Sequence, residues 1–344
     1  MKRTAMLLTL LLLTAQAAAL DYGEALTAAA SRPGAVSAQL ELINAEADHL
    51  RTEGDPLALR NDRLEAQQEL ELAEAELEQA RREAVTEITE AYFGVLSARE
   101  QLALARLGHE LAETALEIAE IRVANGSATE LDLRDARASL DEAAAGLRTA
   151  ESGIRLAVSN LEGVLGRDID ADELEPVPDS WRPPVPALEN VLESITGVPQ
   201  YLEVEHGLEL AGMAVDMLDP AYASEAQIES ARTRLEATEQ LIREARRGFQ
   251  LQARNLHLQA EDAQSKLSVE EDLHANAVER HEFERQRLEG GLISDIEFRQ
   301  SELDLLQAEL ALLSARSEAL GSILELSAET LVPIAGPAEL RGDQ

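Results

Sequence analysis

The sequence contains no cysteine, and aromatic residues make up only 3% of it. The first absence excludes disulfide scaffolds, thiolate metal sites, cysteine nucleophiles and a lipid-anchored cysteine. With so few aromatic side chains, the apolar content, 45% of the chain, is mainly alanine and leucine. This mixture favours long helices that pack closely along small residues over a bulky globular core or a sheet.

Basic residues are scarce beside acidic ones: 30 lysines and arginines stand against 66 aspartates and glutamates, a formal net charge of −36. A field of this sign repels phosphate, so nucleic acid and anionic lipid surfaces are not expected as partners. The ordinary interpretation of this charge is that the acidic residues lie on the solvated outer faces of many helices.

Long apolar runs are absent beyond the first residues. Lys2 and Arg3 precede a short apolar run, residues 5–13, and small residues at positions 15–19 follow it. This order is typical of a secretory signal peptide, residues 1–19, with cleavage after a small-x-small pattern. A transmembrane helix is the alternative, but the run is too short for one. We therefore expect an exported protein with no membrane-spanning helix after signal removal.

Catalytic patterns are also missing. The sequence shows no phosphate loop, nucleophile elbow or dinucleotide fingerprint, and 66 acidic residues make chance carboxylate pairs certain. His274 and His281 lie seven residues apart on one helix face and could hold a metal, but no third ligand is obvious. We favour exposed helix histidines, and we expect neither an enzyme nor a cofactor or metal.

Residues 57–124 contain no proline and only two glycines, Gly94 and Gly108. From residue 70 to residue 119 one seven-residue series is apolar without a miss: Leu70, Leu77, Ala84, Ala91, Ala98, Ala105, Ala112 and Ala119. A second series contains Ile88, Val95, Leu102, Leu116 and Val123 and is interrupted at His109. Two such series predict a coiled-coil seam. A rod of this kind, roughly 100 Å long, must pack on partner helices.

The predicted rod ends in a glycine-centred turn that the chain makes twice. Residues 122–134 align without gaps with residues 287–299, so that Arg122 corresponds to Arg287 and Gly126 to Gly291. We expect Gly126 in the left-handed conformation that ends a helix, and Thr129 or Ser127 as the cap of the next helix. The fold class predicted is all-α, with two tandem repeats of long coiled-coil helical hairpins.

The repeat divides the mature chain. We expect a first hairpin repeat over residues 20–167, a proline-rich linker over 168–186, a second repeat over 187–331 and a flexible tail over 332–344. The linker holds five of the eleven prolines and the only tryptophan, Trp181, and should run in extended form across other elements. Pro56 is expected in the first turn of the first long helix, and the second long helix is expected from residue 221 to 289.

The signal peptide, the tandem repeat and the two turns together resemble the TolC-like outer-membrane efflux family. In that family each turn reads roughly Arg-Tyr-x-x-Gly-x-x-(Ser/Thr)-x-x-Asp-(Val/Leu)-Leu. The matching residues here are Arg122, Gly126, Thr129, Asp132 and Leu133 in the first copy, and Arg287, Gly291, Ser294, Glu297 and Phe298 in the second. Val123 and Leu288 replace the family's aromatic residue. The resemblance covers almost the whole mature chain.

The resemblance implies a homo-trimer that forms a twelve-helix periplasmic tunnel associated with the outer membrane. Its hairpin tips would dock a periplasmic adaptor (membrane-fusion) protein, which links to an inner-membrane pump. The implied docking residues are Arg122, Gly126, Thr129, Arg287, Gly291 and Ser294, and the implied entrance acids are Asp132, Asp135 and Glu297. Two alternatives stay open: any helical hairpin needs such glycines, and acids in a first turn complement the helix dipole.

At one place the sequence departs from the family. Family members insert two β-strands per repeat before each long helix, and a membrane strand needs about 9–11 alternating residues. Only residues 52–56 and 218–220 stand at those points. We therefore expect a form without the β-barrel strands. The predicted function is that of a TolC-like component of an efflux or export system, and the alternative is a non-conducting periplasmic coiled-coil spacer or interaction protein of the cell envelope.

Overall fold

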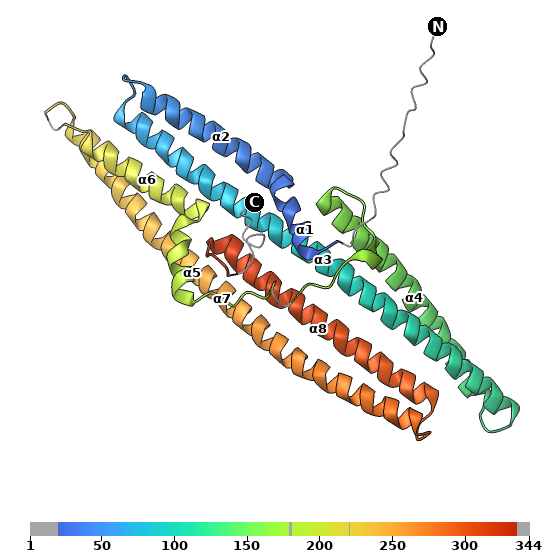
Figure 1. Cartoon of the computed structure of the whole chain (residues 1–344). Coiled ribbons are helices and arrows are strands. Elements are labelled where there is room, and N and C mark those ends of the chain that lie inside the picture. The colour runs from blue at the N-terminus through green and yellow to red at the C-terminus, as the bar shows by residue number, and fades with distance from the viewer. Residues whose placement is uncertain (1–19, 179–180, 220, 336–344) are drawn as a thin grey trace, which may run out of the picture.

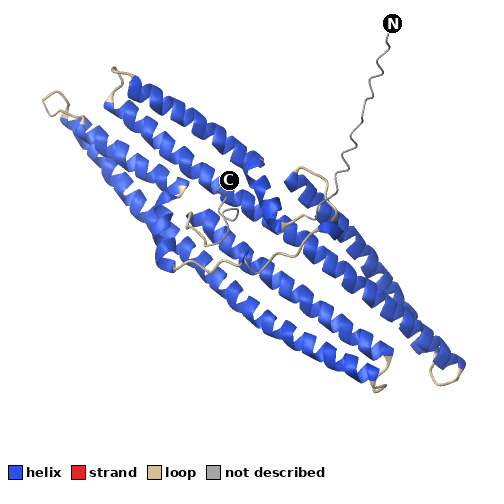
Figure 2. Cartoon of the chain, in the orientation of Figure 1, coloured by secondary structure: helices blue, strands red, loops and turns tan. Residues whose placement is uncertain are grey.

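The computed structural model describes residues 20–178, 181–219 and 221–335. The predicted signal peptide, residues 1–19, lies outside them. Throughout these ranges every regular element is a helix, and the only β-type pairing is an isolated bridge between Leu20 and Leu174 (Figure 2). None of the described helices is long and apolar enough to cross a membrane. The predicted all-α class is confirmed.

Each repeat consists of two short helical segments, one very long helix and a return helix. The elements of the first repeat are α1 (Tyr22–Leu26) with a 3-10 turn (Thr27–Ser31), α2 (Pro33–Gly54), α3 (Arg60–Ala124) and α4 (Glu130–Leu165). Those of the second are α5 (Leu188–Ser194) with a 3-10 turn (Ile195–Gly197), α6 (Pro199–Asp216), α7 (Glu225–Glu289) and α8 (Asp295–Thr330). A further 3-10 turn (Ala171–Glu173) lies between the repeats.

The two hairpins are equal in length. Helices α3 and α7 both have 65 residues, and α4 and α8 both have 36. The start of α3 at residue 60 and of α7 at residue 225 differ by the same 165 residues that separate the two sequence motifs. The tandem repeat predicted from the turns is therefore confirmed over the whole of both hairpins.

Helices α3 and α7 run the length of the molecule, and the shorter helices pack along them (Figure 1). In each repeat the shorter helix, α2 or α6, packs along the first part of the long helix, and the return helix, α4 or α8, packs along its last part. Helix α3 also packs against α8, so the hairpins lie in the order α4, α3, α8, α7. Helices α4 and α7 form the two edges of this layer.

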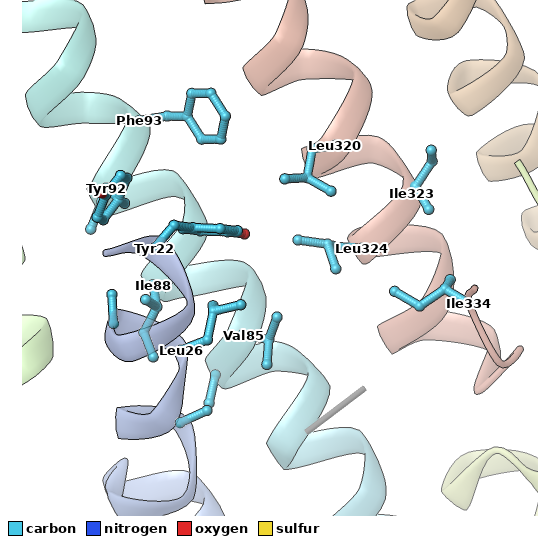
Figure 3. Close-up of a cluster of buried hydrophobic side chains, with 14 of the residues drawn as sticks. Tyr22, Leu26, Val85, Ile88, Tyr92, Phe93, Leu320, Ile323, Leu324 and Ile334 are labelled. Atoms are coloured by element: carbon cyan, nitrogen blue, oxygen red, sulfur yellow. The ribbon is translucent and has the colours of Figure 1, made fainter. Parts of the chain in front are cut away.

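Small residues allow the close packing. In the predicted seam Leu77, Ala84, Ala91 and Ala98 are all buried, because an alanine side chain lets the neighbouring helix approach α3. The largest apolar cluster lies at mid-length, where α1, α3 and α8 meet: Tyr22, Val85, Ile88, Tyr92, Ile323 and Leu324 are each at most 2% exposed (Figure 3). Tyr22, Tyr92 and Phe93 are buried in this cluster, and Trp181 and Phe249 pack against it.

Residues 168–186 are called the strap below, and their described parts, 168–178 and 181–186, contact both hairpins. On α3, the Tyr92 hydroxyl lies 2.6 Å from the Glu175 carbonyl oxygen, and Arg99 Nη1 donates to the Leu174 carbonyl at 3.1 Å. On α7, Arg182 Nη1 lies 2.7 Å from the Glu271 carboxylate. The strap therefore runs over the surface of other elements, as its prolines predict, and it ties α3 to α7.

Both long helices begin later than predicted. Pro56 lies in a turn four residues before α3, because the Asp55 carboxylate accepts the Leu57 N–H at 2.9 Å and holds the chain there. Helix α7 begins at Glu225 and not at residue 221. The Ser224 hydroxyl accepts the Gln227 N–H, and the Gln227 side chain accepts the Ser224 N–H. This reciprocal cap fixes the start of α7.

The expectation that the flexible tail begins at residue 332 is wrong for residues 332–335. Val332 is 0% and Ile334 4% exposed, and both belong to the main cluster. Arg82 on α3 holds residues 332–335 against the long helix, because its Nη1 donates to the carbonyl oxygens of Ser327 at 3.0 Å and Val332 at 2.8 Å. The rest of the expected tail, residues 336–344, lies outside the described residues.

Candidate functional site: the hairpin tips

Both glycine turns lie at one end of the molecule, and the loops that precede α3 and α7 lie at the other end (Figure 1). The two turns, residues 125–129 and 290–294, are called the hairpin tips below. They bring the predicted docking residues of both repeats to a common end, although the repeats are far apart in sequence. The first tip projects from α3 and α4, and the second from α7 and α8.

The first tip ends α3 with a Schellman motif. Gly126 has φ of 72°, in the left-handed region, as predicted. The Gly126 N–H donates to the Val123 carbonyl at 2.9 Å, and the Ser127 N–H donates to the Arg122 carbonyl at 2.8 Å. These two bonds satisfy carbonyls that the end of a helix leaves unpaired. The Ser127 hydroxyl adds a bond of 3.0 Å to the Arg122 carbonyl.

The second tip repeats this geometry. Gly291 has φ of 67°. Its N–H donates to the Leu288 carbonyl at 2.9 Å, and the Leu292 N–H donates to the Arg287 carbonyl at 2.8 Å. Any L-amino acid at either glycine would be strained in this conformation, even though a Cβ atom would meet open space. The two glycines are therefore required by backbone geometry and not by crowding.

Each return helix begins with a capping box. The Thr129 hydroxyl accepts the Asp132 N–H at 3.2 Å, and the Asp132 carboxylate accepts the Thr129 N–H at 2.7 Å. Ser294 and Glu297 make the same pair of bonds at 3.4 and 2.8 Å. The sequence allowed either Thr129 or Ser127 as the cap of α4, and the structure shows that the cap is Thr129. The bond from Thr129 lowers the pKa of Asp132, and that from Ser294 lowers the pKa of Glu297.

These bonds give the two predicted entrance acids a local structural role. Asp132 and Glu297 are exposed, and both complete a cap while remaining at the molecular surface. Asp135, the third predicted acid, is exposed one turn further along α4. The geometry thus leaves all three carboxylates accessible to solvent at the tip end, with two of them held in fixed positions.

The two tip arginines differ. Arg287 Nη1 lies 2.9 Å from the Glu284 carboxylate, and its guanidinium lies 6.0 Å from the centroid of the Phe283 ring. The Arg122 side chain is exposed. Since Arg287 is held against its own helix and Arg122 extends into solvent, the two tips present different surfaces despite equal backbones.

Two features of the tip end were not predicted from the sequence. Arg299 Nη1 lies 2.9 Å from the Glu110 carboxylate of α3, a contact that ties the second hairpin to the first and that no local pattern could indicate. Exposed apolar side chains also flank the turns: Ile121 is 55%, Leu131 63% and Leu292 72% exposed. Ile121 directly precedes the repeated motif, and Leu131 and Leu292 belong to it.

The described residues include no group of three or more histidines, aspartates and glutamates arranged to hold a metal ion. Of the histidine pair singled out by its spacing, His281 Nδ1 lies 3.0 Å from the Ser301 hydroxyl, and its ring lies 5.0 Å from that of Phe298. His281 therefore takes part in the packing of α7 on α8 near the second tip.

Comparison with known proteins agrees with this architecture. Residues 55–167, which contain α3, the first tip and α4, match the family model of the outer membrane efflux protein. The solved structure of CusC matches with a TM-score of 0.63 and 14% identity over 90% of this chain and 95% of that one. The chain has the TolC-like helical fold. Its sequence differs from that of CusC at most positions.

Two further solved structures extend the match. VceC from Vibrio cholerae has a TM-score of 0.60 and 17% identity over 90% of this chain and 95% of that one. MtrE from Neisseria gonorrhoeae has a TM-score of 0.57 and 15% identity over 90% of this chain and 88% of that one. No curated protein sequence matches the chain. At these identities the structural matches establish the TolC-like fold alone.

Proposed function

We propose that the chain is a component of an outer-membrane efflux or export assembly and that its hairpin tips dock a periplasmic adaptor. The observation that carries the proposal is the pair of tips with the same Schellman motif and capping box, placed at one end of a TolC-like layer. The match of residues 55–167 to the outer membrane efflux family supports it. The adaptor would in turn connect to an inner-membrane pump.

The residues proposed to contact the adaptor are the predicted set, with the glycines as its geometric basis. Gly126 and Gly291 set the direction in which Arg122, Arg287 and the neighbouring apolar side chains project. Thr129 and Ser294 fix the start of the return helices. The exposed Ile121 and Leu292 add apolar area that a helical hairpin of the adaptor could cover.

The edges of the layer support a homo-trimer. On α7, Leu251, Leu258, Val269 and Leu273 share one helix face and are 51–69% exposed. On the opposite edge, Leu156 of α4 is 73% exposed. We propose that α7 of one subunit packs against α4 of the next, so that three copies close a tunnel. Export to the periplasm, on the inner side of the outer membrane, follows from the proposed assembly.

Acidic side chains at the tip end suggest a role in the entrance. We propose that Asp132, Asp135 and Glu297 contribute a ring of negative charge where the tunnel opens. The capping boxes hold Asp132 and Glu297 in place without removing their charge, because hydrogen bonds to a carboxylate favour its ionised form. Such a ring would favour cationic over anionic solutes.

Docking can be tested with single cysteines, since the natural chain has none. Ser127→Cys and Leu292→Cys place a thiol on each tip, and Ser159→Cys places one on an exposed site of α4 far along the helix from the tip. Labelled with a photoreactive maleimide in the periplasm, both tip variants should crosslink to the adaptor of the assembly, and the Ser159→Cys control should not.

Crosslinking from Ser159→Cys alone, or from none of the sites, would contradict docking at the tips. The efflux function is tested by measuring the drug sensitivity of a strain that lacks this protein. Drug resistance restored to the deletion strain by the natural chain, but not by a double Gly126→Val, Gly291→Val variant, supports the efflux assignment. Normal drug sensitivity with altered envelope spacing in the deletion strain would instead identify a non-conducting spacer.

A further inference from the structure

The strap covers a cavity between α3, α7 and α8 with a volume of about 390 Å³. This volume lies within the range that proteins use for small organic ligands. The cavity is distinct from the hairpin tips, because its walls come from the middle of the long helices and from the strap itself. Residues 179 and 180 of the strap are outside the described residues, and the candidate ligand site does not include them.

One side of the cavity is apolar. Phe93 on α3 points toward Leu320 on α8 (Figure 3). Leu267 from α7 and Leu312 from α8 continue this wall. Trp181 of the strap also lines the cavity, and its ring centroid lies 5.0 Å from that of Tyr22 in an edge-on contact. An apolar or aromatic body of a ligand would exchange water for carbon contacts with these side chains.

The cationic side chains that line the cavity are already engaged. Arg182 pairs with Glu271 at 2.7 Å, and Arg99 donates to the Leu174 carbonyl at 3.1 Å. Arg316 also has an interaction partner. A ligand anion would have to compete with these contacts, so the arginines of the cavity do not form a ready anion site.

Two carboxylates also line the cavity, Glu309 on α8 and Glu100 on α3, and both are half-buried. Glu100 Oε1 lies 3.7 Å from Arg99 Nε, so Glu100 is partly paired already. Burial raises the pKa of Glu309, and the negative charge of Glu100 raises it further, while His274 and His281 act in the opposite direction. Two carboxyl groups that repel each other beside an apolar wall are unfavourable when both are ionised. A cation placed between them would relieve this repulsion.

We propose that the cavity binds an amphipathic organic cation, with its ammonium group beside Glu309 and Glu100 and its apolar body between Trp181 and Leu312. Such a ligand makes apolar contacts with its body and reduces the repulsion between the carboxylates with its charge. A neutral apolar molecule would leave that repulsion unchanged, and an anion would increase it. An inorganic cation would leave the apolar wall in contact with water.

Ligand binding here would also act on the fold. The strap connects the two repeats, and the cavity lies directly beneath it, so a bound molecule would hold the strap against α8. A ligand that binds only the folded state stabilises it by mass action. Because the cavity is formed within a single chain, binding here does not depend on the proposed efflux assembly.

Trp181 provides a direct probe, since it is the only tryptophan. We would titrate the mature protein with benzyltrimethylammonium, with its uncharged isostere neopentylbenzene and with phenylacetate, and follow tryptophan fluorescence. The cation should give a saturable change, with a Kd at least about tenfold lower than that of the uncharged isostere; phenylacetate should give the weakest response of the three.

Two variants localise the effect. Glu309→Gln should weaken binding of benzyltrimethylammonium by about tenfold and leave that of neopentylbenzene unchanged, which also shows that the cavity is still formed. Glu302→Gln, an exposed glutamate on the same helix, should bind both molecules as the natural chain does. Equal affinity for cation and isostere, a Glu309→Gln variant that binds the cation as before, or no saturable response at all would overturn the proposal.

Discussion

Individual residues at the hairpin tips are determined by backbone geometry. Gly126 and Gly291 occupy the left-handed region, with φ of 72° and 67°. An L-amino acid pays about 1–2 kcal/mol to adopt this conformation. The family resemblance implies that Asp132 and Glu297 lie at a tunnel entrance, and the structure shows that both residues complete capping boxes. Both roles are compatible, since the caps leave the carboxylates exposed.

Replacing a tip glycine should therefore destabilise its hairpin. Gly126→Ala or Gly291→Ala should lower the free energy of unfolding by about 1–2 kcal/mol, and Asn at either site should cost less because it tolerates the left-handed region. Gly153→Ala, in the interior of α4 with open space around its Cβ position, should instead stabilise the chain by about 0.5–1 kcal/mol. Chemical denaturation measures all of these values, and a neutral Gly126→Ala would show that the tip does not need its left-handed residue.

At the scale of elements, the strap is the part that joins the repeats. Its anchoring depends on a close approach at Gly23 of α1, where a Cβ atom would lie 3.0 Å from Cζ2 of Trp181 and 3.2 Å from the Asp21 carboxylate. Gly34 occupies the same second position in α2 and has open space around it. The two glycines form a matched pair for testing how tightly the strap is packed.

Gly23→Ala should displace Trp181 and cost about 1–3 kcal/mol of stability, as overpacking in a close-packed region does. Gly34→Ala should be neutral or slightly stabilising. Tryptophan fluorescence reports the displacement directly, because Trp181 is the only tryptophan. If Gly23→Ala leaves both the emission spectrum and the denaturation midpoint unchanged, the strap is not packed on α1 as described.

The sequence predicted the helical hairpins well for a physical reason. Gly126 was predicted in the left-handed conformation that ends a helix, and the structure places it there. Gly166 ends α4, which runs from Glu130 to Leu165, in the same conformation. The beginning of α7 was missed because Ser224 and Gln227 form a cap that local apolar spacing does not reveal. The burial of Val332 was missed because it depends on Arg82, which lies 250 positions away in the chain.

The candidate site could be predicted only in part. The turn residues carry a local signal and were identified from their repeat. The Arg299–Glu110 ion pair and the cavity beneath the strap depend on how α3 packs against α8, which no local pattern encodes. The strap's extended course followed from its prolines, but its anchoring partners on α3 and α7 did not.

For the molecule as a whole, charge is the dominant feature. Removing Lys2 and Arg3 with the signal peptide would change the formal charge from −36 to −38. Burial first, and then neighbouring carboxylates, raise the pKa of Glu76, Glu309 and Glu329. An acid whose pKa is raised on folding favours the protonated form in the folded state. These groups therefore destabilise the fold at neutral pH, and the effect decreases as pH falls through their raised pKa values.

Mild acidification should consequently stabilise the protein. We expect Tm to rise as the pH is lowered from neutral toward the raised pKa values of the three carboxyls, since they take up protons and self-repulsion decreases. Below about pH 4 the trend should reverse, because Asp132 and Glu297, whose pKa values are lowered in the fold, lose their capping bonds on protonation. Glu76→Gln, Glu309→Gln and Glu329→Gln combined should flatten the rise. A Tm that falls steadily from pH 7.5 would contradict this explanation.

The tunnel itself is the central claim for the whole molecule, and the mass of the mature assembly tests it most directly. Light scattering of the purified mature chain in mild detergent should give three times the mass of one chain. Leu251→Glu with Leu258→Glu, on the exposed face of α7, should reduce it to the mass of one chain, whereas Val278→Glu, on the opposite face of the same helix, should leave the trimer intact. A natural chain that stays monomeric at every concentration would contradict the tunnel.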